Sequence, residues 1–225
     1  MGLAAVEAGA DLALTYRANQ AGAEATARDI RAKGRRAELL QVDISRQEDI
    51  ARLAGRLQHM FPRLDVWINN AGADILTGDA GRLSPPQKLE LVLAVDVRGT
   101  VLASWAAVEL MRKQGGGNIV NMAWDHVGQG MAGENPGIYS AAKGAVASFS
   151  RSLARDVAPR IRVNILAPGF IETAFGEGAL TDWGALLLRE QVGWGTLGNI
   201  LSIGPWLNVL LDFIGSVKDN FPLQI

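Results

Sequence analysis

The sequence contains no cysteine and only two histidines among its 225 residues. The absence of cysteine excludes disulfide bonds, thiolate nucleophiles and zinc sites built on thiolates. The two histidines, His59 and His126, are too few for most metal cages, so we expect no metal site. Lysine and arginine total 22 against 23 acidic residues, a formal net charge of -1. The chain therefore lacks the basic excess typical of nucleic-acid partners, and we expect none.

The sequence also lacks the pattern of a signal peptide and an uninterrupted membrane-length apolar run. Its first residues have no basic segment followed by an apolar core and a cleavage site, so we expect a cytoplasmic protein. The most apolar tract, residues 200–217, contains Pro205, Asn208 and Asp212, and it predicts a buried or partner-facing segment rather than a membrane span. With 48% hydrophobic and 20% charged residues, the sequence predicts one globular domain over residues 1–225.

Short runs of Val, Ile and Leu alternate with longer segments of helical periodicity. The runs are nearly continuously apolar, as in strands that are buried on both faces. This alternation predicts an α/β fold with right-handed crossovers and a doubly wound parallel sheet. The expected strands are residues 12–16, 37–42, 65–69, 118–122 and 161–166. The expected helices are about residues 21–32, 45–60, 84–92, 99–113 and 139–157.

Two of the expected helices have recognisable start signals. Ser45 and Glu48 have the spacing of a capping box, in which each side chain satisfies a free backbone N–H group. Ser84 precedes Pro85, the combination of an N-cap and a first-turn proline. The glycine run at residues 115–117 precedes a strand, so it predicts a turn rather than a phosphate-binding loop.

The residues that follow each expected strand are the candidates for ligand binding, because open α/β sheets bind ligands beyond the carboxyl ends of their strands. The glycines there permit a ligand to approach the backbone closely, and Asn70 and Asp43 offer the polar contacts that an adenosine needs. The sequence therefore predicts a nucleotide-sized crevice. The candidates are Arg17, Asp43, Asn70, Ala71, Gly72, Ala123, Trp124, Asp125, Pro168 and Gly169.

Tyr139 and Lys143 lie four residues apart on an expected helix, so their polar ends can meet on one face. A neighbouring ammonium favours the phenolate and lowers the pKa of the phenol toward the range useful for acid-base catalysis. An ordinary surface pair has the same spacing, so the spacing alone leaves both interpretations open.

Three motifs in this order resemble the short-chain dehydrogenase/reductase family: NNAG at residues 69–72, YSAAK at 139–143 and RVNILAPG at 162–169. The likeness extends over about residues 2–195 and is nearest to β-ketoacyl-carrier-protein reductases and related sugar or alcohol dehydrogenases. It implies a Rossmann-like fold, hydride transfer between a nicotinamide and a carbonyl or alcohol substrate, and a homodimer or homotetramer formed through the helices around residues 101–111 and 140–154.

The resemblance also implies roles for single residues. Tyr139 would protonate the substrate oxygen, while Lys143 would lower the pKa of Tyr139 and bond the nicotinamide ribose. The remaining cofactor contacts implied are Asp43 near the adenine, Asn70, Ala71 and Gly72 along the adenosine ribose, and Pro168, Gly169, Ile171 and Thr173 around the nicotinamide and pyrophosphate.

Residues 15–17 favour NADP over NAD as the cofactor. They contain no acid that would accept a hydrogen bond from a ribose 2′-hydroxyl, whereas Arg17 suits a 2′-phosphate. A solvated charge at the end of a strand is the alternative interpretation of Arg17.

The sequence departs from the family pattern in four places. The first strand and its TGxxxGxG loop are not found, which predicts a sheet without that strand and weaker cofactor binding. Residues 118–138 contain neither Ser nor Thr, and Ala123 stands at or beside the position of the catalytic Ser. Asp96 stands in the place of a catalytic Asn. Residues 196–225 diverge from the family.

Asp96 has two interpretations. In the first, an ionised Asp96 pairs with Lys143 and opposes the phenolate of Tyr139, which makes Asp96 a third candidate catalytic residue. In the second, Asp96 caps a helix.

The whole pattern supports an NADP-dependent reductase or dehydrogenase. The alternative is a catalytically impaired or truncated relative that acts through protein contacts.

Overall fold

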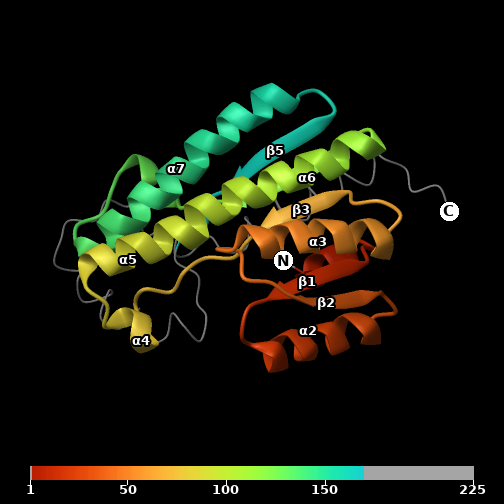
Figure 1. Ribbon diagram of the computed structural model, residues 1–225, viewed down its shortest axis with the longest axis horizontal. Helices are drawn as coiled ribbons and strands as arrows, with labels where there is room; N and C mark the ends of the chain where they lie inside the picture. Colours follow the sequence, from red (N-terminus) through yellow and green to blue (C-terminus); the bar gives the residue numbers. More distant parts are fainter. Residues whose placement is uncertain (1, 170–225) are drawn as a thin grey trace. The chain divides into compact units, whose positions relative to one another are not determined.

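The computed structural model describes residues 2–169 (Figure 1). Two site predictions, Ile171 and Thr173, and the divergent segment 196–225 lie outside the described residues. The described chain divides into two compact units. One comprises residues 2–14 and 21–39 with Gly169, and the other comprises residues 15–20 and 40–168.

The first unit is built around a pair of neighbouring strands. Its elements are α1 (Gly2–Glu7), β1 (Leu12–Tyr16), α2 (Gln20–Ala32) and β2 (Ala37–Gln41), and β1 pairs with β2. Both helices contribute to one small core, because Val6, Ala27 and Ile30 are buried together with Ala37 at the start of β2. The chain turns after α2 at Gly34, whose φ of 75° favours glycine.

The second unit contains a parallel sheet of three strands in the order β3-β4-β5: β3 (Val66–Asn69), β4 (Gly117–Met122) and β5 (Ile161–Leu166). Asn69 lies opposite Asn121, and Met122 lies opposite Leu166. The carboxyl ends of all three strands therefore meet at one edge, where the chain continues into the predicted binding residues.

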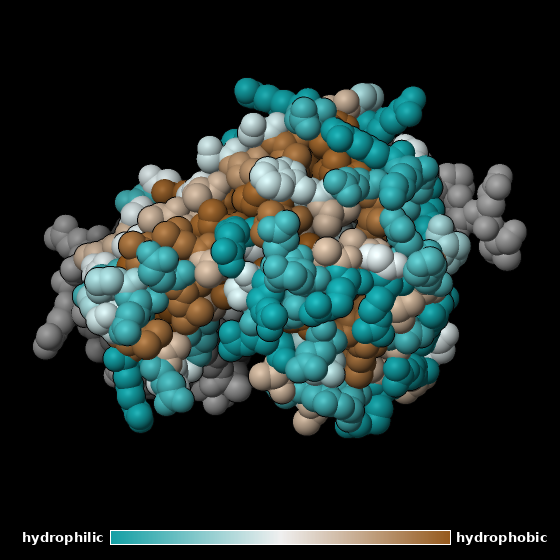
Figure 2. Space-filling view, viewed as in Figure 1, coloured by the Kyte–Doolittle hydropathy of each residue, from teal (hydrophilic) through white to brown (hydrophobic). Residues whose placement is uncertain are grey.

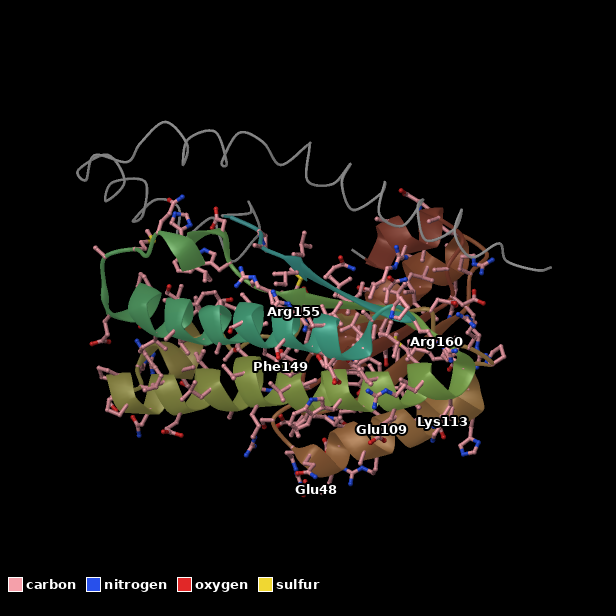
Figure 3. The ribbon with its side chains drawn as sticks, turned by 90° about the horizontal axis from the view of Figure 1, so that it is seen from above. Glu48, Glu109, Lys113, Phe149, Arg155 and Arg160 are labelled. Atoms are coloured by element: carbon pink, nitrogen blue, oxygen red, sulfur yellow. The ribbon has the colours of Figure 1, made fainter. Side chains whose placement is uncertain are left out.

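The helices of the second unit pack beside this sheet. They are α3 (Gln47–Met60), α4 (Gly78–Gly81), α5 (Pro85–Val92), the π-helical segment η1 (Leu93–Gly99), α6 (Thr100–Gln114), the short 3-10 helix η2 (Asp125–Gly128) and α7 (Glu134–Val157). Figures 1 and 3 show α5 and α6 running on as one long helix with α7 beside it.

The long helix over Pro85–Gln114 is apolar enough to cross a membrane by length and composition alone. Half of its most apolar window is buried inside the protein, as in the core helix of a globular domain. Figure 2 shows hydrophobic surface gathered in a band along this helix. Leu93 and Trp105 are its exposed large side chains, 37% and 52% exposed.

The predicted α/β class and parallel strands are confirmed, and each strand agrees with its prediction within one residue. The described strands form two sheets, one of β1 and β2 and one of β3, β4 and β5.

One local prediction is wrong. Ser45 does not open a capping box: α3 begins at Gln47, and the Ser45 backbone N–H and hydroxyl both donate to Asp43, at 2.9 and 2.6 Å. The helices predicted at about residues 84–92 and 99–113 are confirmed as α5 and α6, but the π-helical segment that joins them was not predicted. Single-sequence periodicity misses such a segment because its side chains continue a helical pattern.

The start of α7 also differs from its prediction. The helix begins at Glu134 rather than at Tyr139. Pro136 and Gly137 lie in its first turns, and both residues usually mark a break in a helix. Proline is tolerated in a first turn because the N–H group that it lacks would have no partner there.

Candidate active site

A buried ion pair lies at the centre of the candidate site. The Lys143 Nζ atom on α7 is 2.9 Å from Asp96 Oδ1 on the π-helical segment, and it also donates to the Met122 carbonyl at 3.2 Å. Asp96 is 0% exposed, and its Oδ2 accepts the Ala73 backbone N–H at 2.8 Å. Asp96 therefore pairs with Lys143, as the first interpretation of its position predicted, and it does not cap a helix.

The pair lies beside the ring of Tyr139. The Lys143 Nζ atom is 5.3 Å from the ring centroid, so the predicted meeting of Tyr139 and Lys143 on one face of α7 is confirmed. Burial and, second, the negative charge of Asp96 raise the pKa of Tyr139 to about 12. The predicted lowering of this pKa by Lys143 is therefore wrong, because burial of the ring and, second, the negative charge of Asp96 both disfavour the phenolate.

Two glycines allow the backbone to approach this centre. A Cβ atom on Gly72 would stand 3.1 Å from Asp96 Oδ1, and one on Gly99 would stand 2.9 Å from the Ile44 carbonyl oxygen. The NNAG motif that ends β3 is thereby placed against Asp96. Asn70, Ala71 and Gly72 are exposed, so a ligand can reach the three residues predicted to line the ribose.

Arg17 and Asp43 follow β1 and β2 and lie near each other. The hydrogen bond from the Ser45 hydroxyl is the main cause that lowers the pKa of Asp43, with smaller contributions from the charges of Arg17 and Arg46. Arg17 is exposed, and its backbone carbonyl accepts from the Gln41 side chain at 3.0 Å. The loop that begins at Asp43 reaches η1, because Arg98 donates to the Ser45 carbonyl.

A buried polar network below the site was not predicted. The Asn69 side chain donates to Ser104 at 2.9 Å and to Asn121 at 2.8 Å, and Asn121 in turn donates to Ser150 on α7 at 2.8 Å. The Trp67 indole N–H donates to Asn69 at 2.8 Å. These bonds tie β3 and β4 to the helices that carry Asp96 and Tyr139. The only sequence signal was the presence of asparagine in strands that are otherwise apolar.

Comparison with known proteins gives the family. The sequence profile described as enoyl-(acyl carrier protein) reductase matches residues 2–200. The chain belongs to the short-chain dehydrogenase/reductase family. An uncharacterized oxidoreductase of Mycobacterium tuberculosis is 37% identical over 174 residues, which cover 76% of this chain and 64% of that protein. A 3-oxoacyl-[acyl-carrier-protein] reductase of Synechocystis is 34% identical over 181 residues, 78% of this chain and 70% of that protein.

Solved structures agree with this membership of the short-chain dehydrogenase/reductase family. An NADPH-dependent 3-quinuclidinone reductase of Rhodotorula rubra is similar with a TM-score of 0.66 and 28% identity, over 77% of this chain and 66% of that chain. The chain thus spans about two thirds of the length of these relatives, and 64% of the M. tuberculosis protein.

Within this short-chain dehydrogenase/reductase, the segment after β4 differs from the family pattern that the sequence resembles. Ala123, at or beside the expected Ser, is buried, and its backbone N–H donates to the Leu166 carbonyl at 2.8 Å. The next residue, Trp124, packs edge-to-face on Tyr139 at 5.7 Å between ring centroids. Asp125 bonds the neighbouring His126 with 2.5 Å between Oδ1 and Nδ1. Sequence reasoning gave His126 no partner, because side-chain pairing within a short helical turn has no periodic signal.

Proposed function

We propose that the chain reduces a carbonyl compound with NADPH, and that Tyr139 is its proton donor. The observation that carries the proposal is the cluster of Tyr139, Lys143 and Asp96 at the carboxyl ends of the parallel strands. Family membership supports oxidoreductase chemistry at this edge of the sheet. The similarity to an NADPH-dependent reductase supports the choice of cofactor.

The residues around the cluster fit a nicotinamide cofactor. The Lys143 ammonium lies 2.9 Å from Asp96 Oδ1 and donates one of its three N–H groups to the Met122 carbonyl, so a further N–H group suits a ribose hydroxyl. At the adenosine end, the exposed Arg17 guanidinium suits a 2′-phosphate by charge-assisted hydrogen bonds. Asp43 and the exposed backbone of residues 70–72 suit the adenosine.

The protonation state of Tyr139 is compatible with a role as proton donor. Burial and, second, the charge of Asp96 raise its pKa to about 12, so the phenol is protonated at neutral pH. Carbonyl reduction uses this protonated form, because the hydroxyl gives its proton to the carbonyl oxygen.

The proposed reaction adds a hydride and a proton to a carbonyl group. A bound NADPH would supply the hydride to the carbonyl carbon and become NADP⁺. The Tyr139 hydroxyl donates its proton to the carbonyl oxygen as the π bond breaks, and the phenolate regains a proton from solvent. The products are an alcohol and NADP⁺.

Two measurements test the proposal. Calorimetric titration should show that NADPH binds more tightly than NADH. The absence of heat with both cofactors would contradict the proposal.

The second measurement is the oxidation of NADPH in the presence of ethyl acetoacetate, a soluble 3-oxo ester, which is followed by absorbance. This oxidation should be lost in Tyr139→Phe. The matched control is Tyr16→Phe, which alters the other tyrosine of the chain. Equal rates in the two variants would overturn the assignment of Tyr139.

We also propose that the protein forms a homodimer or homotetramer through α6 and α7. Trp105 on α6 is 52% exposed and packs edge-to-face on Phe149 of α7, which Figure 3 labels beside α6. An exposed indole that packs on a half-buried phenyl ring within an apolar band is typical of a protein interface. Light scattering on Trp105→Glu should show a smaller species than the native chain, and an unchanged mass would contradict this interface.

A further inference from the structure

The segment after β4 places an aromatic stack against Tyr139. The Trp124 and His126 rings are 4.9 Å apart between centroids, with their planes 24° from parallel. The same indole contacts Tyr139 at 5.7 Å, with an angle of 75°. Trp124 therefore touches both His126 and the residue that we propose as the proton donor.

Polar contacts fix this stack in place. Asp125 Oδ1 lies 2.5 Å from His126 Nδ1, and His126 is 8% exposed. The Asp125 backbone N–H donates to the Pro168 carbonyl at 3.4 Å, which ties η2 to the end of β5. The backbone N–H of Gly130 donates to the His126 carbonyl at 2.7 Å. The position of the indole is thus set by its neighbours before any substrate arrives.

Trp124 gives the surroundings of Tyr139 an aromatic ring, where the family pattern has the hydroxyl of a Ser. The Trp124 ring contacts the Tyr139 ring, so a substrate whose carbonyl oxygen bonds the Tyr139 hydroxyl has its substituents within reach of Trp124. The indole offers a flat apolar surface there. Aromatic rings gain from edge-to-face or offset contacts at 4.5–7 Å between centroids, beyond the gain from burial, and a saturated ring does not.

We infer that Trp124 determines substrate specificity, and that the substrate carries an aryl or conjugated planar group next to its carbonyl. His126, held by Asp125, is a positioning residue that acts through Trp124. This inference rests on the proposed function, because it assigns the substrate of the same site.

The test compares two aldehydes of similar size, benzaldehyde and cyclohexanecarbaldehyde, as substrates for NADPH-dependent reduction by the full chain. The measured quantity is kcat/KM for benzaldehyde divided by kcat/KM for cyclohexanecarbaldehyde. A change in the amount of active protein alters both values equally and leaves this ratio unchanged. In Trp124→Leu this ratio should fall about 2- to 10-fold, mainly through KM for benzaldehyde. Trp124→Phe should keep the ratio. Trp105→Leu, which alters an exposed indole on α6, is the matched control and should leave the ratio unchanged.

Variants of His126 test its positioning role. His126→Ala should lower the ratio, whereas His126→Phe, which keeps a ring against the indole, should restore it. An unchanged ratio in Trp124→Leu, with native turnover and loss of turnover in Tyr139→Phe, would overturn the inference and leave the proposed function standing. No turnover of either aldehyde by a native chain that reduces ethyl acetoacetate would overturn the inference alone, and no turnover of any of the three compounds would overturn both.

Discussion

Replacing Asp96 by Asn perturbs the charge balance around Tyr139 with little change in shape. The Lys143 Nζ atom lies 5.3 Å from the Tyr139 ring centroid. At an effective dielectric constant of about 20, a unit charge at this distance favours the phenolate by about 3 kcal/mol, or about two pKa units. In the native protein the Asp96 carboxylate, 2.9 Å from Nζ, offsets most of this effect. We therefore predict that Asp96→Asn lowers the pKa of Tyr139 by about one to two units.

The assay uses the small number of tyrosines. The chain has two, so Tyr16→Phe leaves Tyr139 as the single phenol, whose ionisation is followed by ultraviolet absorbance. The pKa is measured in this background with and without Asp96→Asn. Asp65→Asn is the control, because Asp65 pairs with Arg63 near the surface. A Tyr139 pKa that stays constant or rises in Asp96→Asn would refute the reasoning.

Three further predictions concern binding and stability. Arg17→Gln should weaken NADPH binding about 10- to 100-fold in calorimetry and leave NADH binding unchanged; equal losses would contradict the role of Arg17. Asn121→Ala should lower the free energy of unfolding in urea by about 2 to 4 kcal/mol, because it removes one buried hydrogen bond from Asn69 and one from Ser150 and leaves a cavity; a loss below about 0.5 kcal/mol would contradict this. Tyr139 ionises near pH 10 in the unfolded chain and near 12 in the folded protein, so the stability it contributes is complete below pH 10 and is lost as pH rises to 12, by about 2 to 3 kcal/mol. Tyr139→Phe should remove this part of the pH dependence.

The strands and the site motifs are predictable from the sequence for a simple reason. β4 is buried along nearly its whole length, and both β4 and β5 contain the Val and Ile residues that favour buried parallel strands. The four-residue spacing of Tyr139 and Lys143 fixes their relation on any helix, so their meeting required only that α7 be helical.

The charge state of the site is not predictable in the same way. The direction in which the pKa of Tyr139 shifts depends on how deeply the ring is buried and on how near the Asp96 carboxylate lies. Both depend on the packing of η1 against α7. Ser45 shows a related limit, because its hydroxyl bonds the Asp43 carboxylate two residues before it, and this local bond competes with capping of the helix. The stack of Trp124 on His126 depends on local geometry after β4 that has no periodic signal.

The most direct test of carbonyl reduction at Tyr139 is the transfer of deuterium from NADPH in which both hydrogens at the reactive carbon of the nicotinamide are replaced by deuterium. The native chain and Tyr139→Phe are incubated with labelled NADPH and benzaldehyde, and the alcohol is analysed by nuclear magnetic resonance. We predict deuterium at the former carbonyl carbon with the native chain and at most a trace with Tyr139→Phe. Unlabelled alcohol, no alcohol from the native chain, or equal labelling by both proteins would contradict the account.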